Sequence, residues 1–520
     1  MSQSASHAHR RIDQQVRTAE RHLGQGELAA ADVAATLALA LDPAHPGAQL
    51  TLARIQRARG HLADARGSLQ ALLAARPDDA AVRRELAGVL GDAQCLAEAI
   101  ALLRHPVPTD ADSWFELGRL QDLDGDADAA LAAARSALAL SPRHTGAQFL
   151  AARSLVALGD IEAAADIYRR LTQDAAHAAR AWFALLDLKT VPLQDYELRR
   201  LERLQANAPS DEDRLFATFA LGSAYEQRQR PEAAFRCFEE ANRRKRRTAP
   251  WNAQRFTALV DTIIDAFPAA APRGGSQGGN VVFLLGLPRS GSTLLERLLA
   301  GHPDVVAASE LPDLPQILAA ESQRRGQPLP DWFDRASEAD WLRLGAEYLE
   351  RTSRWQTRRV FTDKFPENWL YAPAIVRMLP GARLVRCQRD PLEALWSCYK
   401  QLFAPGMFHW SYDFAALAAY AGDCARLWRH LSGLEPDRCF THAYEALAAD
   451  PAAQVRRVLS FLGLPFDAAC LDAGARAGQT RTASAAQVRQ PLHAASRRAD
   501  GYGELLGPLR QALVDRQVEG

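Results

Sequence analysis

The chain lacks both a net charge and any long apolar run. Its 62 basic and 62 acidic side chains balance over 520 residues, so no overall field favours nucleic acid or a membrane surface. No apolar segment approaches the roughly 20 residues that a membrane-spanning helix needs. Residues 1–20 are polar and mildly basic, which is not the pattern of a signal peptide. We therefore expect no nucleic-acid partner and no membrane partner.

Cysteine is also scarce. The seven cysteines form no Cys-x-x-Cys pair, and cysteine, histidine and acidic residues form no set with the spacing of a metal site. An odd number of cysteines in apolar contexts is typical of free thiols in a reducing compartment. The sequence predicts a cytoplasmic protein with neither a disulfide framework nor a metal.

Lysine is rarer still, because only Lys189, Lys245, Lys364 and Lys400 occur. The other 58 of the 62 basic residues (62 − 4) are arginine. Together with abundant alanine, this usage suggests a GC-rich bacterial genome. The four lysines become candidates for a specific role.

Residues 15–250 have a helical pattern that repeats about every 34 residues. One turn type recurs as Gly26-Glu-Leu, Gly60-His-Leu, Gly125-Asp-Ala and Gly159-Asp-Ile. The period is that of tetratricopeptide repeats, which stack into an α-solenoid. Matching positions are Trp114, Leu117, Gly118, Ala130, Ala137 and Pro142 in one unit, and Leu221, Gly222, Tyr225, Ala234, Phe238 and Ala241 in the last. A plain helical bundle is the alternative.

A glycine- and proline-rich linker at 268–280 separates the array from a different kind of sequence. Strands and helices alternate over residues 281–515, which predicts an α/β domain with a mostly parallel sheet. The fold class is thus an α-solenoid followed by an α/β domain.

The α/β part opens on a phosphate-loop-like motif. Residues 281–285 form an apolar strand, 286–291 a glycine-bounded turn and 292–300 a helix, which together favour an anion site. The turn nearly matches GxxxxGK[ST], but Ser292 replaces the lysine that reaches the outer phosphates of a nucleoside triphosphate. This difference argues against a nucleoside kinase, and Arg289 supplies a cation instead. A buried strand–turn–helix without a ligand is the alternative.

A second strand–turn–helix motif spans residues 383–399. Arg389 ends the strand and Ser397 follows two helical turns later, so both side chains could reach one phosphate. Arg389 could instead pair only with Asp390 or Glu393.

Together the two motifs resemble the 5′-phosphosulfate and 3′-phosphate motifs of sulfotransferases, which use 3′-phosphoadenosine 5′-phosphosulfate (PAPS). The resemblance covers nearly all of 281–515. It is closest to tyrosylprotein sulfotransferases and to bacterial proteins that join tetratricopeptide repeats to such a domain. Supporting segments are His302-Pro-Asp-Val, Ser309-Glu-Leu, Thr362-Asp-Lys-Phe-Pro-Glu-Asn, Tyr444-Glu-Ala-Leu and Thr482 to Pro491.

The resemblance implies a set of site residues. It makes Glu310 the base and Lys364 a proton donor near the bridging oxygen. By residue type alone, Glu310 could be a helix cap or solvated, and Lys364 could reflect codon drift. Arg289 and Ser484 complete the catalytic set. The nucleotide set is Arg289, Ser290, Gly291, Ser292 and Thr293 on the 5′ side, Arg389 and Ser397 on the 3′ side, and Tyr444, Gln487, Val488, Arg489 and Arg498 around them.

One position departs from the family pattern. Gln401 stands where a second basic residue follows on the 3′-phosphate helix, so Lys400 or Arg498 is a candidate to compensate.

These observations predict a PAPS-dependent sulfotransferase that needs no metal. The acceptor is a hydroxyl, with tyrosine in a peptide as one candidate and a carbohydrate or lipid hydroxyl as others. The array would present a protein or peptide acceptor, or serve only as a packing or homodimer surface. The rival function is an interaction scaffold whose α/β domain senses nucleotide or is inactive.

Overall fold

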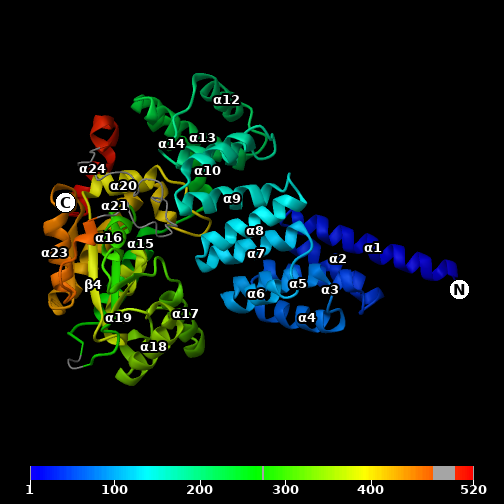
Figure 1. The fold of residues 1–520 in the computed structure, drawn as a ribbon, viewed down its shortest axis with the longest axis horizontal. Helices are drawn as coiled ribbons and strands as arrows, with labels where there is room; N and C mark the ends of the chain where they lie inside the picture. Colours follow the sequence, from blue (N-terminus) through cyan, green and yellow to red (C-terminus); the bar gives the residue numbers. More distant parts are fainter. Residues whose placement is uncertain (1, 272–274, 472–497, 519–520) are drawn as a thin grey trace. The chain divides into compact units, whose positions relative to one another are not determined.

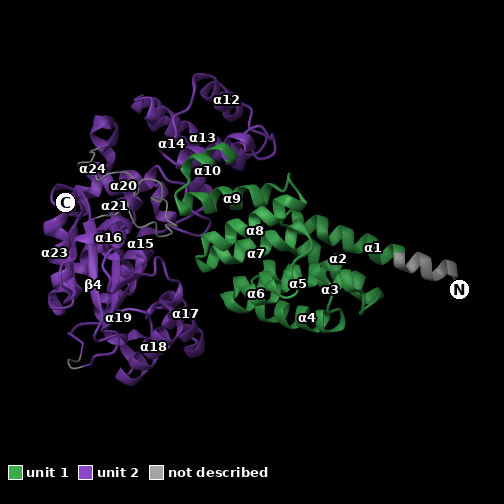
Figure 2. Cartoon of the chain, viewed as in Figure 1, with its two compact units in different colours: residues 1–167 green, residues 168–520 purple. Residues whose placement is uncertain are grey.

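The computed structural model describes residues 2–271, 275–471 and 498–518 (Figure 1). The predicted site residues Ser484, Gln487, Val488 and Arg489 lie outside these ranges. The chain divides into two compact units, residues 1–167 and 168–520 (Figure 2).

The first unit is wholly helical in its described part, as the repeat pattern predicts. Its helices are α1 (Ser2–Gly24), α2 (Leu28–Leu41), α3 (Pro46–Ala58), α4 (Leu62–Ala75), α5 (Ala80–Asp92), α6 (Leu96–Arg104), α7 (Ala111–Asp124), α8 (Ala127–Leu140), α9 (Thr145–Leu158) and the start of α10 (Ile161–Leu171).

Glycine makes the turns of this unit possible. Gly26, Gly60, Gly125 and Gly159 have φ of 77, 81, 97 and 96°, a left-handed conformation that costs glycine little. Gly118 has a different role, because a Cβ there would lie 2.8 Å from Cδ2 of Leu150. The repeat motif therefore encodes both the turns and the close approach of paired helices.

The second unit begins with further helices, α11 (Ala178–Asp187), α12 (Asp195–Ala206), α13 (Asp211–Gln227), α14 (Pro231–Thr248) and α15 (Ala253–Ala266). A five-stranded parallel sheet follows, in the order β2-β3-β1-β4-β5. Its strands are β1 (Val281–Gly286), β2 (Val305–Ala307), β3 (Val360–Lys364), β4 (Arg383–Gln388) and β5 (Cys439–Ala443). The parallel sheet that the sequence predicts is confirmed.

Helices cover the sheet and continue the unit. They are α16 (Ser292–Ala300), α17 (Asp313–Arg325), α18 (Glu338–Arg351), α19 (Ala372–Met378), α20 (Pro391–Tyr399), α21 (Phe414–Leu434), α22 (Tyr444–Ala449), α23 (Pro451–Phe461) and α24 (Gly507–Asp515). None of the helices in the described ranges is long and apolar enough to cross a bilayer.

Strand β1 is buried on both faces. Val282 and Leu284 join the core under α16 and α23, whereas Phe283 and Leu285 join the larger core on the other face. This two-sided burial explains why the strand reads as a continuous apolar run instead of alternating with polar residues.

The larger core also includes residues of α13 and α14, two of the helices before the sheet. Phe238 on α14 lies edge-on to Trp396 on α20, with ring centroids 5.9 Å apart. The buried Asn242 amide donates to the backbone carbonyl of Tyr399 at 2.9 Å. Helices α13 and α14, which the sequence assigns to the array, therefore belong to the same compact unit as the sheet.

His442 on β5 is a buried titratable group, and neither of its ring nitrogens has a hydrogen-bond partner in the described part of the chain. Burial, and next the charge of Arg457, lower the pKa of His442 from 6.5 to about 4. Because its pKa is lower in the folded state, His442 makes its full contribution to the free energy of unfolding above the unfolded-state pKa. That stability is lost as the pH falls through the folded-state pKa.

We therefore expect the free energy of unfolding of the wild type to fall between pH 6.5 and pH 4. The slope from this group is at most about 1.4 kcal/mol per pH unit. The variant His442→Leu should lose less stability over the same range, because its buried side chain takes up no proton. Urea denaturation at a series of pH values measures both. Equal losses in the two proteins would show that His442 is not the acid-sensitive group.

Candidate active site

The candidate residues gather at the carboxyl ends of three parallel strands. The phosphate-loop-like turn follows β1, Arg389 follows β4, and Lys364 is the last residue of β3. Strand β3 therefore includes Lys364 itself. In open parallel sheets this edge is the usual place for a ligand.

The turn after β1 has a backbone that glycine requires at two positions. Gly286 has φ of 133°, and a Cβ there would lie 2.5 Å from the carbonyl oxygen of Cys387. Gly291 has φ of 90°, and its Cβ would lie 2.5 Å from Cδ2 of Tyr444. The turn is therefore packed closely between β4 and the Tyr444 ring.

Helix α16 leads away from this turn without a side-chain cap or an acidic residue in its first turn. Ser292 and Thr293 are buried at its start, and the buried hydroxyl of Ser290 has no hydrogen-bond partner among the described residues. The positive end of the helix dipole and a spare hydroxyl donor suit an anion.

The two motifs meet through their arginines. Nε of Arg289 donates to the Ser397 hydroxyl at 2.9 Å, and Nη1 of Arg389 donates to the Arg289 carbonyl at 3.4 Å. The Arg389 guanidinium also lies over the Tyr444 ring, 4.9 Å from its centroid. The structure thus brings Arg289, Arg389, Ser397 and Tyr444 into one group.

Arg389 has an acidic neighbour but keeps an unused donor. Its Nη2 lies 3.5 Å from the carboxylate of Glu393, a long contact, and its buried Nε has no partner among the described residues. Asp390 instead caps α20 by accepting from the Glu393 N–H at 3.0 Å. An unpaired buried donor costs about 1–3 kcal/mol, so this geometry favours a ligand at Arg389.

Charges of both signs surround Arg289. Burial lowers the pKa of Arg289, the charges of Cys398 and Asp187 oppose this shift, and repulsion from Arg389 and Arg498 adds to it. An arginine stays protonated at neutral pH even so. A bound anion would relieve this repulsion.

Lys364 and Glu310 form a second group at the same sheet edge. Nζ of Lys364 donates to Oε1 of Glu310 at 2.5 Å. The Lys364 side chain is 1% exposed, whereas that of Glu310 is 37% exposed. A buried ammonium therefore meets a carboxylate that is open to solvent.

The backbone before Glu310 is held in an uncommon conformation. Ser309 has φ of 62°, and its carbonyl accepts the Lys364 N–H at 2.9 Å. Oε1 of the buried Glu296 accepts from the Ser309 N–H at 3.1 Å and from the Thr362 hydroxyl at 2.7 Å. Glu296 on α16 thus fixes the turn that presents Glu310.

Asp363, the residue before Lys364, is the centre of a buried hydrogen-bond network. It accepts from the Tyr348 hydroxyl at 2.8 Å and from the Asn368 amide at 3.2 Å. Burial raises the pKa of Asp363 to about 8 and also raises the pKa of Glu296. Sequence reasoning missed both roles, although a glutamate among the leucines of α16 was a visible signal for Glu296.

Lys400 and Arg498, the two candidates to supply the positive charge that Gln401 lacks, have different surroundings. Nζ of Lys400 binds the carboxylate of Glu226 on α13, which also accepts from the Tyr502 hydroxyl at 2.9 Å. Arg498 begins the segment Arg498–Leu506, whose Ala499 N–H donates to Glu393 at 2.7 Å.

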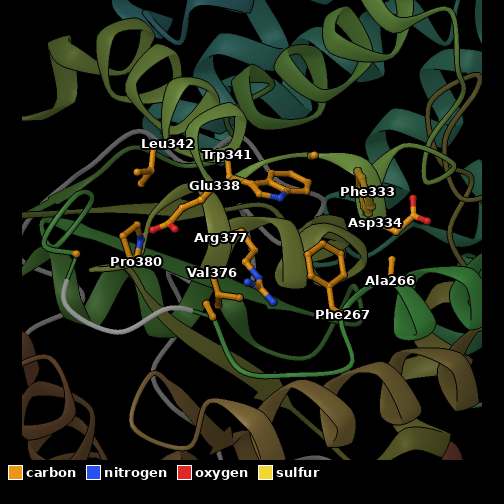
Figure 3. Close-up of a pocket in the computed structure, with 13 residues that line it drawn as sticks. Ala266, Phe267, Phe333, Asp334, Glu338, Trp341, Leu342, Val376, Arg377 and Pro380 are labelled. Atoms are coloured by element: carbon orange, nitrogen blue, oxygen red, sulfur yellow. The ribbon is translucent and has the colours of Figure 1, made fainter.

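A separate pocket lies away from this site (Figure 3). Phe267, Phe333 and Trp341 line it, with the side chain of Arg377 among them. Its lining includes Pro380, in the segment that enters β4, so it is near the amino ends of the strands. The described residues hold no group of three histidine, cysteine or acidic side chains that could bind a metal.

Comparison with known proteins identifies both regions. Residues 281–468 match the model of the sulfotransferase family, and residues 22–88 and 123–187 match that of the tetratricopeptide repeat. The chain carries tetratricopeptide repeats and a sulfotransferase-family domain. This confirms the resemblance that the two nucleotide motifs and the repeat period suggest.

Proteins similar in sequence to this chain differ in length and name. An uncharacterized protein of Aquifex aeolicus is 27% identical over 392 residues, which are 72% of this chain and 51% of that protein. A protein-tyrosine sulfotransferase of Drosophila melanogaster is 27% identical over 220 residues, 37% of this chain and 39% of its own length. The matched region is thus about half or less of these relatives' length.

Among solved structures, the sulfotransferase domain of a Synechococcus olefin synthase is similar with a TM-score of 0.31 and 20% identity. That match covers 48% of this chain and 99% of the solved domain.

Proposed function

We propose that this chain is a sulfotransferase that moves a sulfuryl group from PAPS to a hydroxyl, with tyrosine in a peptide as the acceptor. The observation that carries the proposal is the pairing of two groups at one sheet edge. Arg289, Arg389 and Ser397 supply cations and a hydroxyl for a doubly phosphorylated nucleotide, and Lys364 and Glu310 supply a cation and a base.

The nucleotide residues divide between the two phosphates. Ser290 to Thr293, at the end of the turn and the start of α16, would bind the 5′-phosphosulfate through the helix end and the Ser290 hydroxyl, which has no partner among the described residues. Arg389 would bind the 3′-phosphate with the Nε that has no partner in the described ranges, with Ser397 beside it. Tyr444 would hold the Arg389 guanidinium in place by its ring face.

The reaction follows from the second group. The acceptor oxygen attacks sulfur, the bond from sulfur to the bridging oxygen breaks, and Glu310 takes the hydroxyl proton. Lys364 donates a hydrogen bond to the bridging oxygen, which leaves on 3′-phosphoadenosine 5′-phosphate. Lys364 therefore has to turn from Glu310 to the donor, and this movement frees the carboxylate for the acceptor.

Two observations support a peptide tyrosine as acceptor. The Drosophila relative is named a protein-tyrosine sulfotransferase, and Glu310 is the exposed member of the catalytic pair. The repeat array would present that peptide, because stacked helical repeats form extended binding surfaces.

The rival, a scaffold with an inactive domain, is less consistent with the buried charges. Lys364 is buried, and Arg389 keeps a buried Nε without a partner in the described part of the chain. Such groups cost free energy, and a domain that binds no substrate would gain nothing from keeping them.

Nucleotide discrimination tests the donor assignment. We expect the chain to bind 3′-phosphoadenosine 5′-phosphate more tightly than adenosine 5′-phosphate, and Arg389→Ala to weaken the first by about ten- to a hundredfold. This follows from the roughly 1.5–3 kcal/mol of a hydrogen bond to a charged group. Calorimetry measures both affinities.

Arg383→Ala is the matched control, because Arg383 starts the same strand at the opposite edge of the sheet. It should bind like the wild type. Equal affinity of the wild-type chain for the two nucleotides would contradict the donor assignment.

A further inference from the structure

A lysine from the helices before the sheet contacts Gln401, which the structure places just beyond the end of α20 and not on the helix as the sequence predicts. Lys189 lies in the connection between α11 and α12, and its Nζ donates to Oε1 of Gln401 at 3.0 Å. The same ammonium lies 3.5 Å from the carboxylate of Asp187, which accepts from the Gln401 amide at 3.1 Å. Lys189, Asp187 and Gln401 thus contact one another, although Lys189 and Gln401 are 212 residues apart in the sequence.

The backbone at Lys189 is itself unusual. Its φ of 60° is left-handed, a conformation that costs a non-glycine residue about 1–2 kcal/mol. Lys189 follows the end of α11, and its N–H donates to the Leu186 carbonyl at 3.0 Å, so this left-handed residue ends the helix in a common way. The turn leaves the Lys189 side chain in contact with Gln401.

The Lys189 ammonium interacts electrostatically with Arg289 of the candidate site. Burial, and next the charge of Arg289, lower the pKa of Lys189 to about 8, although Asp187 opposes the shift. Cys398 is next to Ser397 on α20. The charge of Lys189 there opposes the rise in the pKa of the Cys398 thiol that burial causes. Lys189 and Asp187 therefore bring one charge of each sign near Arg289.

We propose that Lys189 is a donor-binding residue that contacts the 3′-phosphate of the nucleotide, with Gln401 positioning its side chain. This inference rests on the proposed function. Gln401 is buried four residues beyond Ser397, so a side chain held by it lies on the 3′-phosphate side of the site. Lys189, from the connection between α11 and α12, thus supplies the cation that Gln401 lacks.

This assignment gives α11 and the residues after it a function in the chemistry. The donor site is then built from two stretches far apart in the sequence, and Asp187 serves to orient the lysine while the nucleotide is absent. When the phosphate binds, it replaces part of the Asp187 contact as the partner of Lys189.

The test compares four full-length proteins by calorimetry with two nucleotides. The proteins are the wild type, Lys189→Ala, Lys189→Arg and Lys245→Ala, and the nucleotides are 3′-phosphoadenosine 5′-phosphate and adenosine 5′-phosphate. Lys245 is the matched control, because it is a lysine near the end of α14 in the same unit.

We expect Lys189→Ala to weaken binding of the bisphosphate by about ten- to a hundredfold, the loss of one charge-assisted hydrogen bond. Binding of adenosine 5′-phosphate should be unchanged, Lys189→Arg should retain most of the affinity, and Lys245→Ala should match the wild type. A residue with a merely structural role would weaken both nucleotides equally.

Unchanged bisphosphate affinity in Lys189→Ala, or an equal loss for both nucleotides, would overturn the inference. Either result leaves the proposed function standing if the wild type still prefers the bisphosphate. If the wild type bound both nucleotides equally well, the proposed function itself would be wrong.

Discussion

Replacing Glu310 by glutamine should lower kcat by about 10²–10⁴, the usual cost of removing a general base. The amide keeps the size of the side chain but cannot accept the proton of the acceptor hydroxyl. Affinity for 3′-phosphoadenosine 5′-phosphate should stay within about twofold of the wild type, because a base acts on the acceptor and not on the donor.

Steady-state rates at several pH values, with calorimetry on the same protein, measure the two effects separately. Glu338→Gln is the matched control, because Glu338 is exposed at the start of α18 and lines the pocket away from the site (Figure 3). Wild-type turnover in Glu310→Gln across this pH range would make Glu310 a structural partner of Lys364.

Replacing Lys364 by methionine should lower kcat by about 10²–10³, comparable to the loss of one donor that stabilises developing charge. Methionine fills similar space in this buried position but offers no proton to the bridging oxygen. The nucleotide product should bind with little change, since its 5′-phosphate is held mainly by the start of α16 in our proposal.

The double variant Glu310→Gln with Lys364→Met distinguishes a shared step from two independent effects. Residues that act together in one step are non-additive, so the double variant should be little slower than the slower single one. Lys245→Met is the control for loss of a lysine. A Lys364→Met protein with wild-type kcat would show that the ammonium only orients Glu310.

Local patterns in the sequence predict much of the fold. The repeat period depends on turn glycines and on small residues such as Gly118, and the structure shows the positive φ and the close helix contact that these residues permit. The strand β1, the following turn and α16 were equally predictable, because a two-sided apolar run between glycines leaves few alternatives.

Contacts across long stretches of sequence could not be predicted in this way. No local signal indicates that Phe238 packs on Trp396, or that Lys189 reaches Gln401. The sequence therefore places an array boundary near residue 250, whereas the compact units divide after residue 167. Removing residues 1–250 would expose the Trp396 surface, so that truncation would not report on the array alone.

The predicted catalytic pair shows the same limit on a smaller scale. The motifs indicate Glu310 and Lys364, but their direct contact depends on the left-handed turn at Ser309 and on Glu296 beneath it. Such a turn is unusual for serine and is fixed by a partner from another helix.

Transfer of labelled sulfur is the most direct test of the central claim. The full-length chain is incubated with PAPS that carries radioactive sulfur and with tyrosine-containing peptides, and parallel samples receive carbohydrate or lipid hydroxyl acceptors. We predict that label moves to peptide tyrosine, with one 3′-phosphoadenosine 5′-phosphate released for each sulfuryl group transferred, and that Glu310→Gln abolishes most of the transfer. Tight binding of the nucleotide without transfer to any of these hydroxyl groups would contradict the account and favour a nucleotide-sensing scaffold.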